Sequence, residues 1–274
     1  MGELTKKPHF AVLGTCGFDL YAKVVENGEA GASEIFVKSF IPPFDLAASY
    51  ESVIDFPTPA VRDITIHFPL YSEVKNLYVG LAKGASLVAA ASYTYTQPVV
   101  YYGSSITQGG CASRPGNSYS SILSRTFDTD YINLGFSGNA KGEPEIANYI
   151  KSLPMSIFVY DYDYNAPTPE HLKATHEAMF LTIREAHPET PIIMMCRPYY
   201  TATPDSILRH QIIKTTYENA LDGGDKNVYM ISGRELMLLA QNDGTVDGVH
   251  PTDLGFYSMA QALMPIIERI LHKN

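Results

Sequence analysis

The sequence predicts an α/β protein whose main part is a three-layer fold around a parallel sheet, preceded by a small all-β sandwich. Two observations support this prediction. From residue 97 onward, short continuous apolar runs alternate with longer segments of helical period, as in a parallel sheet covered by helices on both faces. Before that point, apolar runs of period two are interrupted by Gly, Pro, Asn and Asp, which is typical of antiparallel strands. We therefore divide the chain into a β-sandwich-like module, residues 1–96, and a second domain, residues 97–274.

The N-terminal module contains four candidate strands separated by turn-forming residues. Ile64, Ile66 and Phe68 alternate with more polar neighbours, which is the period expected of a strand with one buried face. No long helical pattern interrupts the series. The predicted strands cover residues 18–25, 34–41, 63–70 and 76–82.

The second domain alternates five apolar runs with five helical segments. One helix is expected to begin at Thr168, a good capping residue, with Pro169 in its first turn, and to end near Ala186. This order predicts a flavodoxin-like parallel sheet, whose ligand site lies beyond the carboxyl ends of the strands. The predicted strands are 98–103, 131–136, 156–162, 191–196 and 227–232, and the other helices are 117–126, 143–152, 205–221 and 255–271.

The composition excludes several classes of protein. There are 20 Lys and Arg against 29 Asp and Glu, so the net charge of -9 argues against a nucleic-acid partner, whose phosphates attract basic surfaces. Three widely spaced cysteines exclude a disulfide scaffold and a zinc knuckle. No apolar run is long enough to span a membrane. The first residues lack a signal peptide's apolar segment, so we expect a soluble, cytoplasmic protein, or a periplasmic or secreted one if a signal has been removed.

Polar or glycine-rich segments follow the predicted strands, at residues 103–110, 136–140, 163–167 and 247–251. The first lacks the Gly-Lys-Ser/Thr ending of a nucleotide loop and does not match Gly-x-Gly-x-x-Gly, so a phosphate cradle is not expected. A serine nucleophile is the remaining chemical interpretation. A serine hydroxyl needs a neighbouring base, and His250 with Asp247 three residues before it supplies the base and the carboxylate that orients it.

These segments resemble the sequence blocks of the SGNH hydrolase superfamily, the GDSL-type esterases and lipases. The Gly-Ser-Ser-Ile turn at 103–106 resembles the family's nucleophile turn, and the blocks follow in the family's order. The resemblance implies Ser105 as the nucleophile and His250 as the general base, oriented by Asp247. It also implies an oxyanion hole built from the N–H groups of Ser105 and Gly138 and the side-chain amide of Asn165.

The stretch from Tyr101 through the Cys-Ala-Ser-Arg-Pro-Gly segment at 111–116 resembles a bacterial subgroup that carries a small β-sandwich ahead of the hydrolase domain. Cys111 and Arg114 follow the nucleophile turn and are candidate substrate-binding residues. Arg114 is suited to an anionic or polyhydroxylated substrate, although a structural role is equally compatible with its position.

The chain departs from the family pattern near two of these blocks. Ser104 replaces the common Asp before the nucleophile, which removes a carboxylate that usually helps to hold the turn. Asp163 replaces the usual Gly two residues before Asn165, and Ala166 replaces the Asp that often follows it. A carboxylate facing the oxyanion would be unfavourable, so we expect Asp163 to point away from it.

The expected function is hydrolysis of a carboxylic ester through an acyl-serine intermediate. A short acyl group, such as an acetyl ester of a carbohydrate, is favoured because the chain has no long apolar lid segment and its β-module resembles modules that contact glycans. No cofactor or metal is expected: Asp161, Asp163, Asp247 and His250 offer ligands for Mn or Mg, but no second well-spaced His accompanies them. The alternatives are an acyltransferase with the same triad and a catalytically inactive hydrolase domain that carries a glycan-binding module. The sequence does not indicate the oligomeric state.

Overall fold

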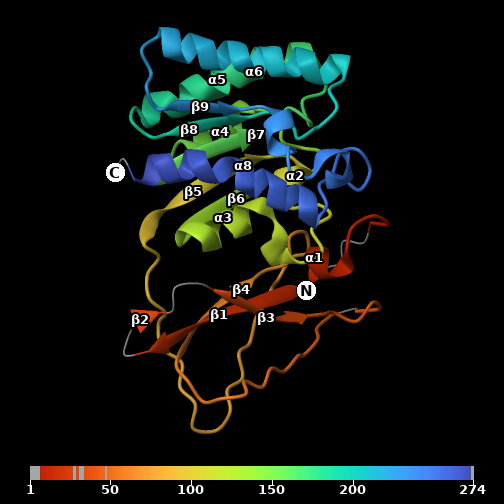
Figure 1. Ribbon diagram of the computed structural model, residues 1–274, viewed down its shortest axis with the longest axis vertical. Helices are drawn as coiled ribbons and strands as arrows, with labels where there is room; N and C mark the ends of the chain where they lie inside the picture. Colours follow the sequence, from red (N-terminus) through yellow and green to blue (C-terminus); the bar gives the residue numbers. More distant parts are fainter. Residues whose placement is uncertain (1–6, 27–28, 31–33, 47, 273–274) are drawn as a thin grey trace.

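The computed structural model describes residues 7–26, 29–30, 34–46 and 48–272. These residues form two sheets, a five-stranded parallel sheet between layers of helices and a smaller antiparallel sheet built from the N-terminal part (Figure 1). The predicted fold class, a flavodoxin-like α/β domain preceded by a small β module, is confirmed at this level.

The parallel sheet has the strand order β6-β5-β7-β8-β9. Because the chain passes from β5 to β6 on one side and then to β7 on the other, the carboxyl end of β5 is the switch point of the sheet, where open α/β sheets bind ligands. The strands are β5 (Tyr95–Gly103), β6 (Thr129–Gly135), β7 (Ile157–Asp161), β8 (Ile192–Met195) and β9 (Val228–Ile231).

Alternate side chains of these strands enter two separate apolar cores. Val99 and Tyr101 of β5 pack toward α3 and α8, whereas Val100 and Tyr102 pack toward α4, α5 and α6. All four side chains are almost completely buried, and such burial stabilises a fold by about 1.5–3 kcal/mol per large apolar side chain. This two-sided burial explains the continuous apolar runs. The helices are α3 (Tyr119–Phe127), α4 (Pro144–Ile150), α5 (Pro169–Ala186), α6 (Pro204–Asp222) and α8 (Asp253–Leu271).

Local capping fixes where the helices begin. The Thr168 hydroxyl accepts the N–H of His171, and α5 begins at Pro169, as its sequence predicts. The shorter elements are α1 (Val12–Cys16), α2 (Ser105–Gln108), α7 (Gly233–Leu236) and the 3-10 turns η1 (Pro115–Asn117) and η2 (Gln241–Gly244).

The antiparallel sheet is centred on β1 (Phe18–Glu26), which pairs with β3 (Ile35–Phe40) and β4 (Arg62–His67) over overlapping residues. The two-residue β2 (Glu29–Ala30) pairs with the end of β1. The prediction of a strand at 76–82 is wrong, because residues 68–94 contain no strand. β1 is paired with β3 and β4, and the 76–82 segment does not add to the outer edge of either strand. The described part of the N-terminal module thus forms a single sheet, and the second sheet of a sandwich is not found in it.

A buried carboxylate connects the N-terminal sheet to the segment around η1. Asp19 of β1 is fully buried and accepts the N–H of Gly116 and a 2.7 Å bond from Arg114. Burial raises the pKa of Asp19, although the bonds from Arg114 and Gly116 act in the opposite direction. Removing Arg114 would leave the fully buried Asp19 carboxylate without its charged partner, so this pair stabilises the contact between the N-terminal sheet and η1.

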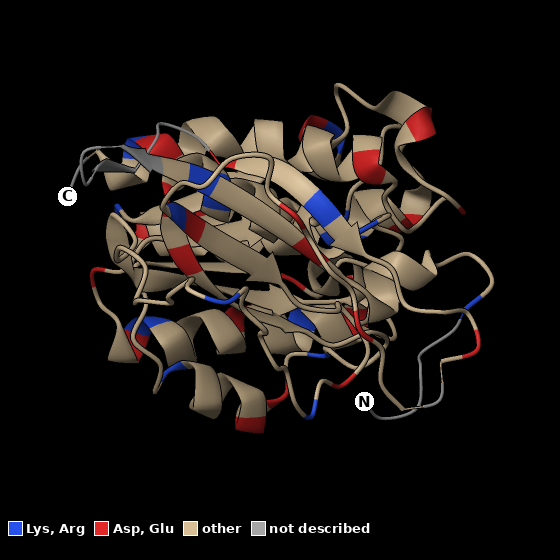
Figure 2. Cartoon of the chain, turned by 90° about the horizontal axis from the view of Figure 1, so that it is seen from below, with Lys and Arg blue, Asp and Glu red and all other residues tan. Residues whose placement is uncertain are grey.

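Charged residues of both signs are interspersed over the N-terminal strands (Figure 2). Lys23 on β1, for example, lies opposite Asp63 on β4 and also bonds the Asp128 carboxylate at 2.8 Å. None of the helices in the described residues combines the length and the hydropathy needed to cross a membrane.

Candidate active site

The nucleophile turn lies where β5 ends and the short helix α2 begins. Ser105 is the first residue of α2, and the Ser104 hydroxyl caps that helix by accepting the N–H of Ile106 at 3.1 Å. A Cβ at Gly103 would overlap the Asp161 carboxylate, so only glycine fits at the end of the strand. The Ser104 hydroxyl thus stabilises the turn through a local hydrogen bond, at the position where the family pattern has a carboxylate.

Ser105, His250 and Asp247 form one continuous chain of hydrogen bonds. Ser105 Oγ lies 2.9 Å from His250 Nε2, and His250 Nδ1 lies 2.8 Å from Asp247 Oδ2. The carboxylate can only accept, so Nδ1 carries the proton and the lone pair of Nε2 faces the serine hydroxyl. The structure therefore brings together all three residues implied as a triad.

The Asp247 carboxylate is held as an anion by the loop that carries it. Its Oδ1 accepts the backbone N–H groups of His250, at 2.8 Å, and Val249, at 3.0 Å. Partial burial alone would raise the pKa of Asp247, but these bonds and the His250 side chain lower it to about 2. The carboxylate is consequently ionised at neutral pH and can stabilise an imidazolium.

The three candidate oxyanion donors each follow a parallel strand: Ser105 follows β5, Gly138 follows β6 and Asn165 follows β7. Gly138 has a left-handed φ of 74°, and neither its N–H nor that of Ser105 has an acceptor among the described residues. The Asn165 amide donates one hydrogen to the Phe136 carbonyl at 2.9 Å, which leaves its second hydrogen available. Gln108 Oε1 accepts the N–H of Ser137 at 3.0 Å and so fixes the Gly138 turn beside α2.

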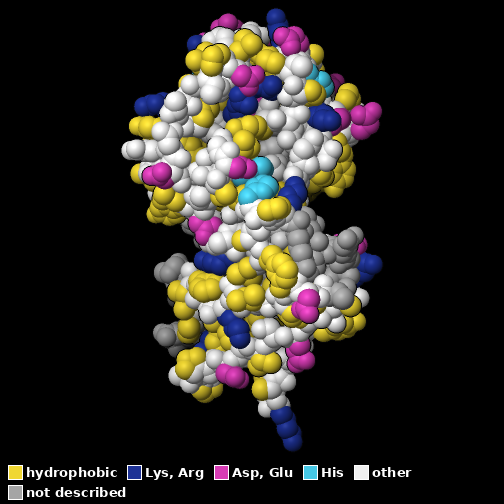
Figure 3. Space-filling model, turned by 90° about the vertical axis from the view of Figure 1, so that its right-hand side faces the viewer, with side chains coloured by type: hydrophobic (Ala, Val, Ile, Leu, Met, Phe, Trp, Pro, Cys, Tyr) yellow, Lys and Arg dark blue, Asp and Glu magenta, His cyan; other side chains and the backbone are white. Residues whose placement is uncertain are grey.

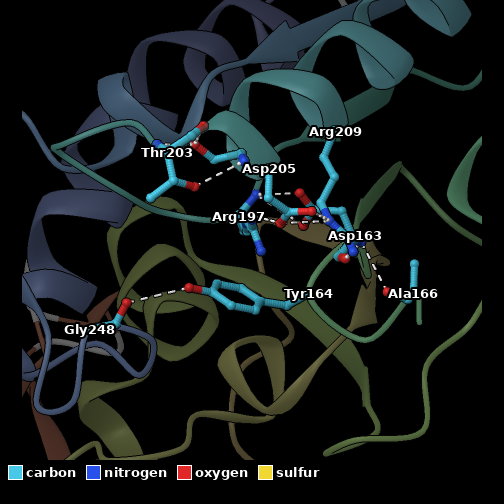
Figure 4. Close-up of polar contacts among 9 residues, drawn as sticks. Asp163, Tyr164, Ala166, Arg197, Thr203, Asp205, Arg209 and Gly248 are labelled. Atoms are coloured by element: carbon cyan, nitrogen blue, oxygen red, sulfur yellow. Dashed lines mark hydrogen bonds and ion pairs between the residues drawn. The ribbon is translucent and has the colours of Figure 1, made fainter. Parts of the chain in front are cut away.

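The carboxylate of Asp163, which replaces the family's usual Gly, forms hydrogen bonds with a group other than these donors. It is buried, and its two oxygens accept the backbone N–H of Arg197 at 3.0 and 3.2 Å (Figure 4). Arg209 bonds the carbonyls of Asp163 and Ala166, and Asp205 contacts both arginines. Burial raises the pKa of Asp163 to about 6, although the arginines and the N–H of Arg197 act in the opposite direction.

Asp161 lies at the end of β7, next to the nucleophile turn. Its Oδ1 accepts the hydroxyl of Thr107, and burial raises its pKa well above the usual range. Asp161 and Asp163 therefore bond different groups, and they do not gather with Asp247 and His250 as the metal alternative requires. His250 instead lies in a second group of metal-binding residues, with His9 and Cys111, and the ligand atoms of these three described residues lie within 4.8 Å of one another.

The two candidate substrate-binding residues have different surroundings. Arg114 contacts Asp19 and Tyr21 of the N-terminal sheet, and its guanidinium lies 4.1 Å from the centre of the Phe36 ring. These contacts give Arg114 a structural role between the two parts. Cys111 lies beside His250 and has a left-handed φ of 71°. Burial raises the pKa of its thiol to about 12, and the charge of Asp247 acts in the same direction. Its thiol is therefore not a rival nucleophile at neutral pH.

The N-terminal part adds three residues that the sequence patterns do not single out. The rings of His9 and Phe10 lie 5.5 and 5.3 Å from the His250 ring, and the Tyr71 hydroxyl donates to the Ser105 carbonyl at 3.3 Å. Figure 3 shows histidine side chains exposed beside an acidic side chain on one face of the molecule. His9 is separated from His250 by most of the chain, and no motif connects them.

This fold and these strand-end segments define an α/β protein of the SGNH hydrolase class. The chain belongs to the GDSL-like lipase/acylhydrolase family, whose model matches residues 96–268. A second model, for the N-terminus of SGNH-hydrolase-type esterases, matches residues 2–87.

Solved structures with this architecture include hydrolases and a transferase. A protein from Bacteroides ovatus described as a GDSL-like lipase is 30% identical, with 98% of this chain and 78% of that chain covered and a TM-score of 0.84. The salicylyl-acyltransferase SsfX3 from a tetracycline biosynthetic pathway is 20% identical, covering 97% and 76%, with a TM-score of 0.69. A family two carbohydrate esterase from Clostridium thermocellum is 14% identical, covering 95% and 90%, with a TM-score of 0.58. No curated protein matches the sequence. Family and fold together support an esterase or hydrolase.

Proposed function

We propose that the protein is a serine hydrolase that cleaves short-acyl carboxylic esters, with acetyl esters of carbohydrates as the leading substrate class. The observation that carries this proposal is the unbroken hydrogen-bond chain from Ser105 through His250 to Asp247. A serine hydroxyl becomes an effective nucleophile when an oriented imidazole accepts its proton, and the lone pair of His250 Nε2 faces that proton.

The proposed reaction proceeds in two steps. Ser105 Oγ attacks the ester carbonyl while its proton passes to His250 Nε2, and the resulting oxyanion accepts bonds from Ser105, Gly138 and Asn165. Collapse of this intermediate breaks the bond to the alcohol, which leaves with the proton from His250. Water then attacks the acyl-serine with His250 as the base, and the acid product and free Ser105 are released.

Two features support a short acyl group. The buried Phe10 and the partly buried Tyr71 pack against Gly110 after the nucleophile turn, since a Cβ there would lie about 3 Å from the Phe10 ring and the Tyr71 hydroxyl, and this favours a small acyl group. The chain also lacks a long apolar lid segment. Solved proteins with this fold include an esterase active on acetylated mannans; at 20% identity that likeness concerns the fold, and it guides the choice of substrates to test.

A panel of esters tests the substrate proposal. We expect 4-nitrophenyl acetate and butyrate to be cleaved with the highest kcat/KM, and acetylated oligosaccharides to release acetate. A preference for decanoate or longer esters would contradict the short-acyl proposal. Product analysis with alcohol acceptors distinguishes hydrolysis from acyl transfer, because a transferase would form the new ester in place of free acid.

A further inference from the structure

We propose that His9, Cys111 and His250 form an inhibitory site for a thiophilic divalent ion, with Zn²⁺ as the chemical type. Each residue offers one ligand atom, and the three atoms lie within 4.8 Å of one another. Small side-chain adjustments bring such atoms to the spacing of a tetrahedral zinc site, whose Zn–N and Zn–S bonds are about 2.0–2.3 Å. The inhibitory consequence rests on the proposed function, whereas the binding itself does not.

The three ligands come from separate segments that already contact one another. The Cys111 thiol donates to the His9 carbonyl at 3.3 Å, and Phe10 contacts both the His9 ring, at 4.6 Å, and the His250 ring, at 5.3 Å. Cys111 is buried and His250 is partly buried, whereas the His9 side chain is 38% exposed, so His9 is the ligand that must be ordered when an ion binds. This arrangement reduces the cost of ordering the ligands when an ion binds.

The donor set selects the kind of ion. Imidazole and thiolate are the ligands of zinc and copper, whereas Mg²⁺ and Ca²⁺ prefer oxygen. The Asp247 carboxylate lies 3.7 Å from His9 Nε2, so a nearby negative charge favours a cation. On binding, the ion displaces the proton of the Cys111 thiol, which passes to solvent, and each imidazole contributes a lone pair. Because burial raises the pKa of this thiol, the displacement is opposed at low pH and Zn²⁺ affinity should increase with pH. Three protein ligands leave the fourth position for water.

Coordination at either nitrogen of His250 would interrupt the proposed catalysis. At Nε2 the ion takes the lone pair that accepts the Ser105 proton. At Nδ1 the ring proton moves to Nε2, so the bond to Asp247 is lost and Nε2 can no longer accept the Ser105 proton. The site therefore couples the N-terminal segment to the catalytic base, and the ion acts as an inhibitor instead of a cofactor.

The test measures binding and activity separately on the full-length, chelator-treated protein. A chromophoric chelator in competition reports Zn²⁺ affinity, and hydrolysis of 4-nitrophenyl acetate reports inhibition. We expect one Zn²⁺ per chain, loss of activity that follows occupancy, recovery with EDTA, and no effect of Mg²⁺. Cys111→Ser and His9→Gln should each weaken Zn²⁺ binding at least about tenfold, with an equal shift in the inhibition curve relative to that variant's metal-free rate.

Cys196→Ser is the matched control, because Cys196 is also buried and lies 3.4 Å from a histidine nitrogen, on His210, outside the cluster. Its Zn²⁺ affinity should equal that of the parent protein. Unchanged Zn²⁺ binding in both Cys111→Ser and His9→Gln would overturn the proposal. A protein without esterase activity would overturn the proposed function instead, while the chelator titration would still decide whether the site exists.

Discussion

The two parts of the chain contribute to the candidate site in different ways. The parallel sheet supplies the groups that would react, because Ser105, Gly138 and Asn165 follow three adjacent strands and His250 precedes α8. The N-terminal part supplies surrounding contacts from His9, Phe10 and Tyr71. The groups proposed to react thus lie at the ends of strands packed between two cores, and loop residues of the N-terminal part contact them from one side.

Burial explains this division. Val100 and Phe158 in the parallel sheet are completely buried, whereas Val24 and Ile35 in the N-terminal sheet are 39% and 59% exposed. A strand packed on both faces is held more rigidly than one packed on a single face, so it positions its terminal residues more accurately.

The largest expected effect on kcat comes from a residue that follows a strand of the parallel sheet. Ser105→Ala removes the nucleophile and should lower kcat for 4-nitrophenyl acetate by about 10⁴-fold or more. Ser104→Ala is the matched control, because it removes only the cap of α2 and should cost about 1 kcal/mol of stability while most activity remains. If Ser104→Ala were inactive and Ser105→Ala fully active, the nucleophile would be Ser104 and the assignment of Ser105 would be wrong.

Asn165→Ala tests the oxyanion donors. Loss of one such donor should lower kcat by about 10²–10³-fold, which corresponds to about 3–4 kcal/mol, with a smaller change in KM. Asn139→Ala provides a comparison from the neighbouring turn, since that amide donates to the Ser137 carbonyl and is exposed. Equal losses in both variants would indicate a general disturbance of the turns and would argue against a specific role for Asn165.

The same difference in burial explains what could be predicted from the sequence. All five parallel strands produce continuous apolar runs, and their order places the polar segments at one edge. The resemblance of these segments to the SGNH sequence blocks then implies Ser105, Asp247 and His250 as one group. The segment 76–82 has the local pattern of a strand but does not pair with the sheet, and pairing depends on distant residues that a local pattern does not contain. The contacts of His9 and Tyr71 with the candidate site likewise depend on how the N-terminal part packs against the parallel sheet. No sequence motif predicts that packing.

A third, smaller effect concerns the buried carboxylate beside the oxyanion loop. The pKa of Asp163 is raised to about 6 in the folded protein from an ordinary value of 3.8, so the folded state binds its proton more tightly. This contribution to stability is fully present below pH 3.8 and is lost as the pH rises through about 6. Its full value, reached below pH 3.8, is roughly 3 kcal/mol.

Urea unfolding of the wild type and Asp163→Asn at pH 4 and pH 7 measures this contribution, because the other carboxyl groups are common to both proteins. Asparagine keeps an oxygen that can accept the N–H of Arg197. The variant should gain stability relative to the wild type as the pH rises. An identical pH dependence in both proteins would show that Asp163 does not titrate as described.

The smallest effect is expected from the N-terminal side. Tyr71→Phe removes one 3.3 Å hydrogen bond to the Ser105 carbonyl, which is typically worth about 0.5–1.5 kcal/mol, so kcat should fall by no more than about tenfold. Tyr78→Phe, at an 87% exposed position in the same part, should change nothing. A loss beyond 100-fold for Tyr71→Phe would remove the distinction between a reacting part and a supporting part.

Covalent labelling by a fluorophosphonate probe tests the central claim most directly, because the probe reacts only with an activated serine. Peptide mass spectrometry of the labelled protein should place one adduct on Ser105, and labelling should disappear in Ser105→Ala and His250→Ala while Ser104→Ala remains labelled. An unlabelled wild-type protein, or an adduct on a different serine, would contradict the account.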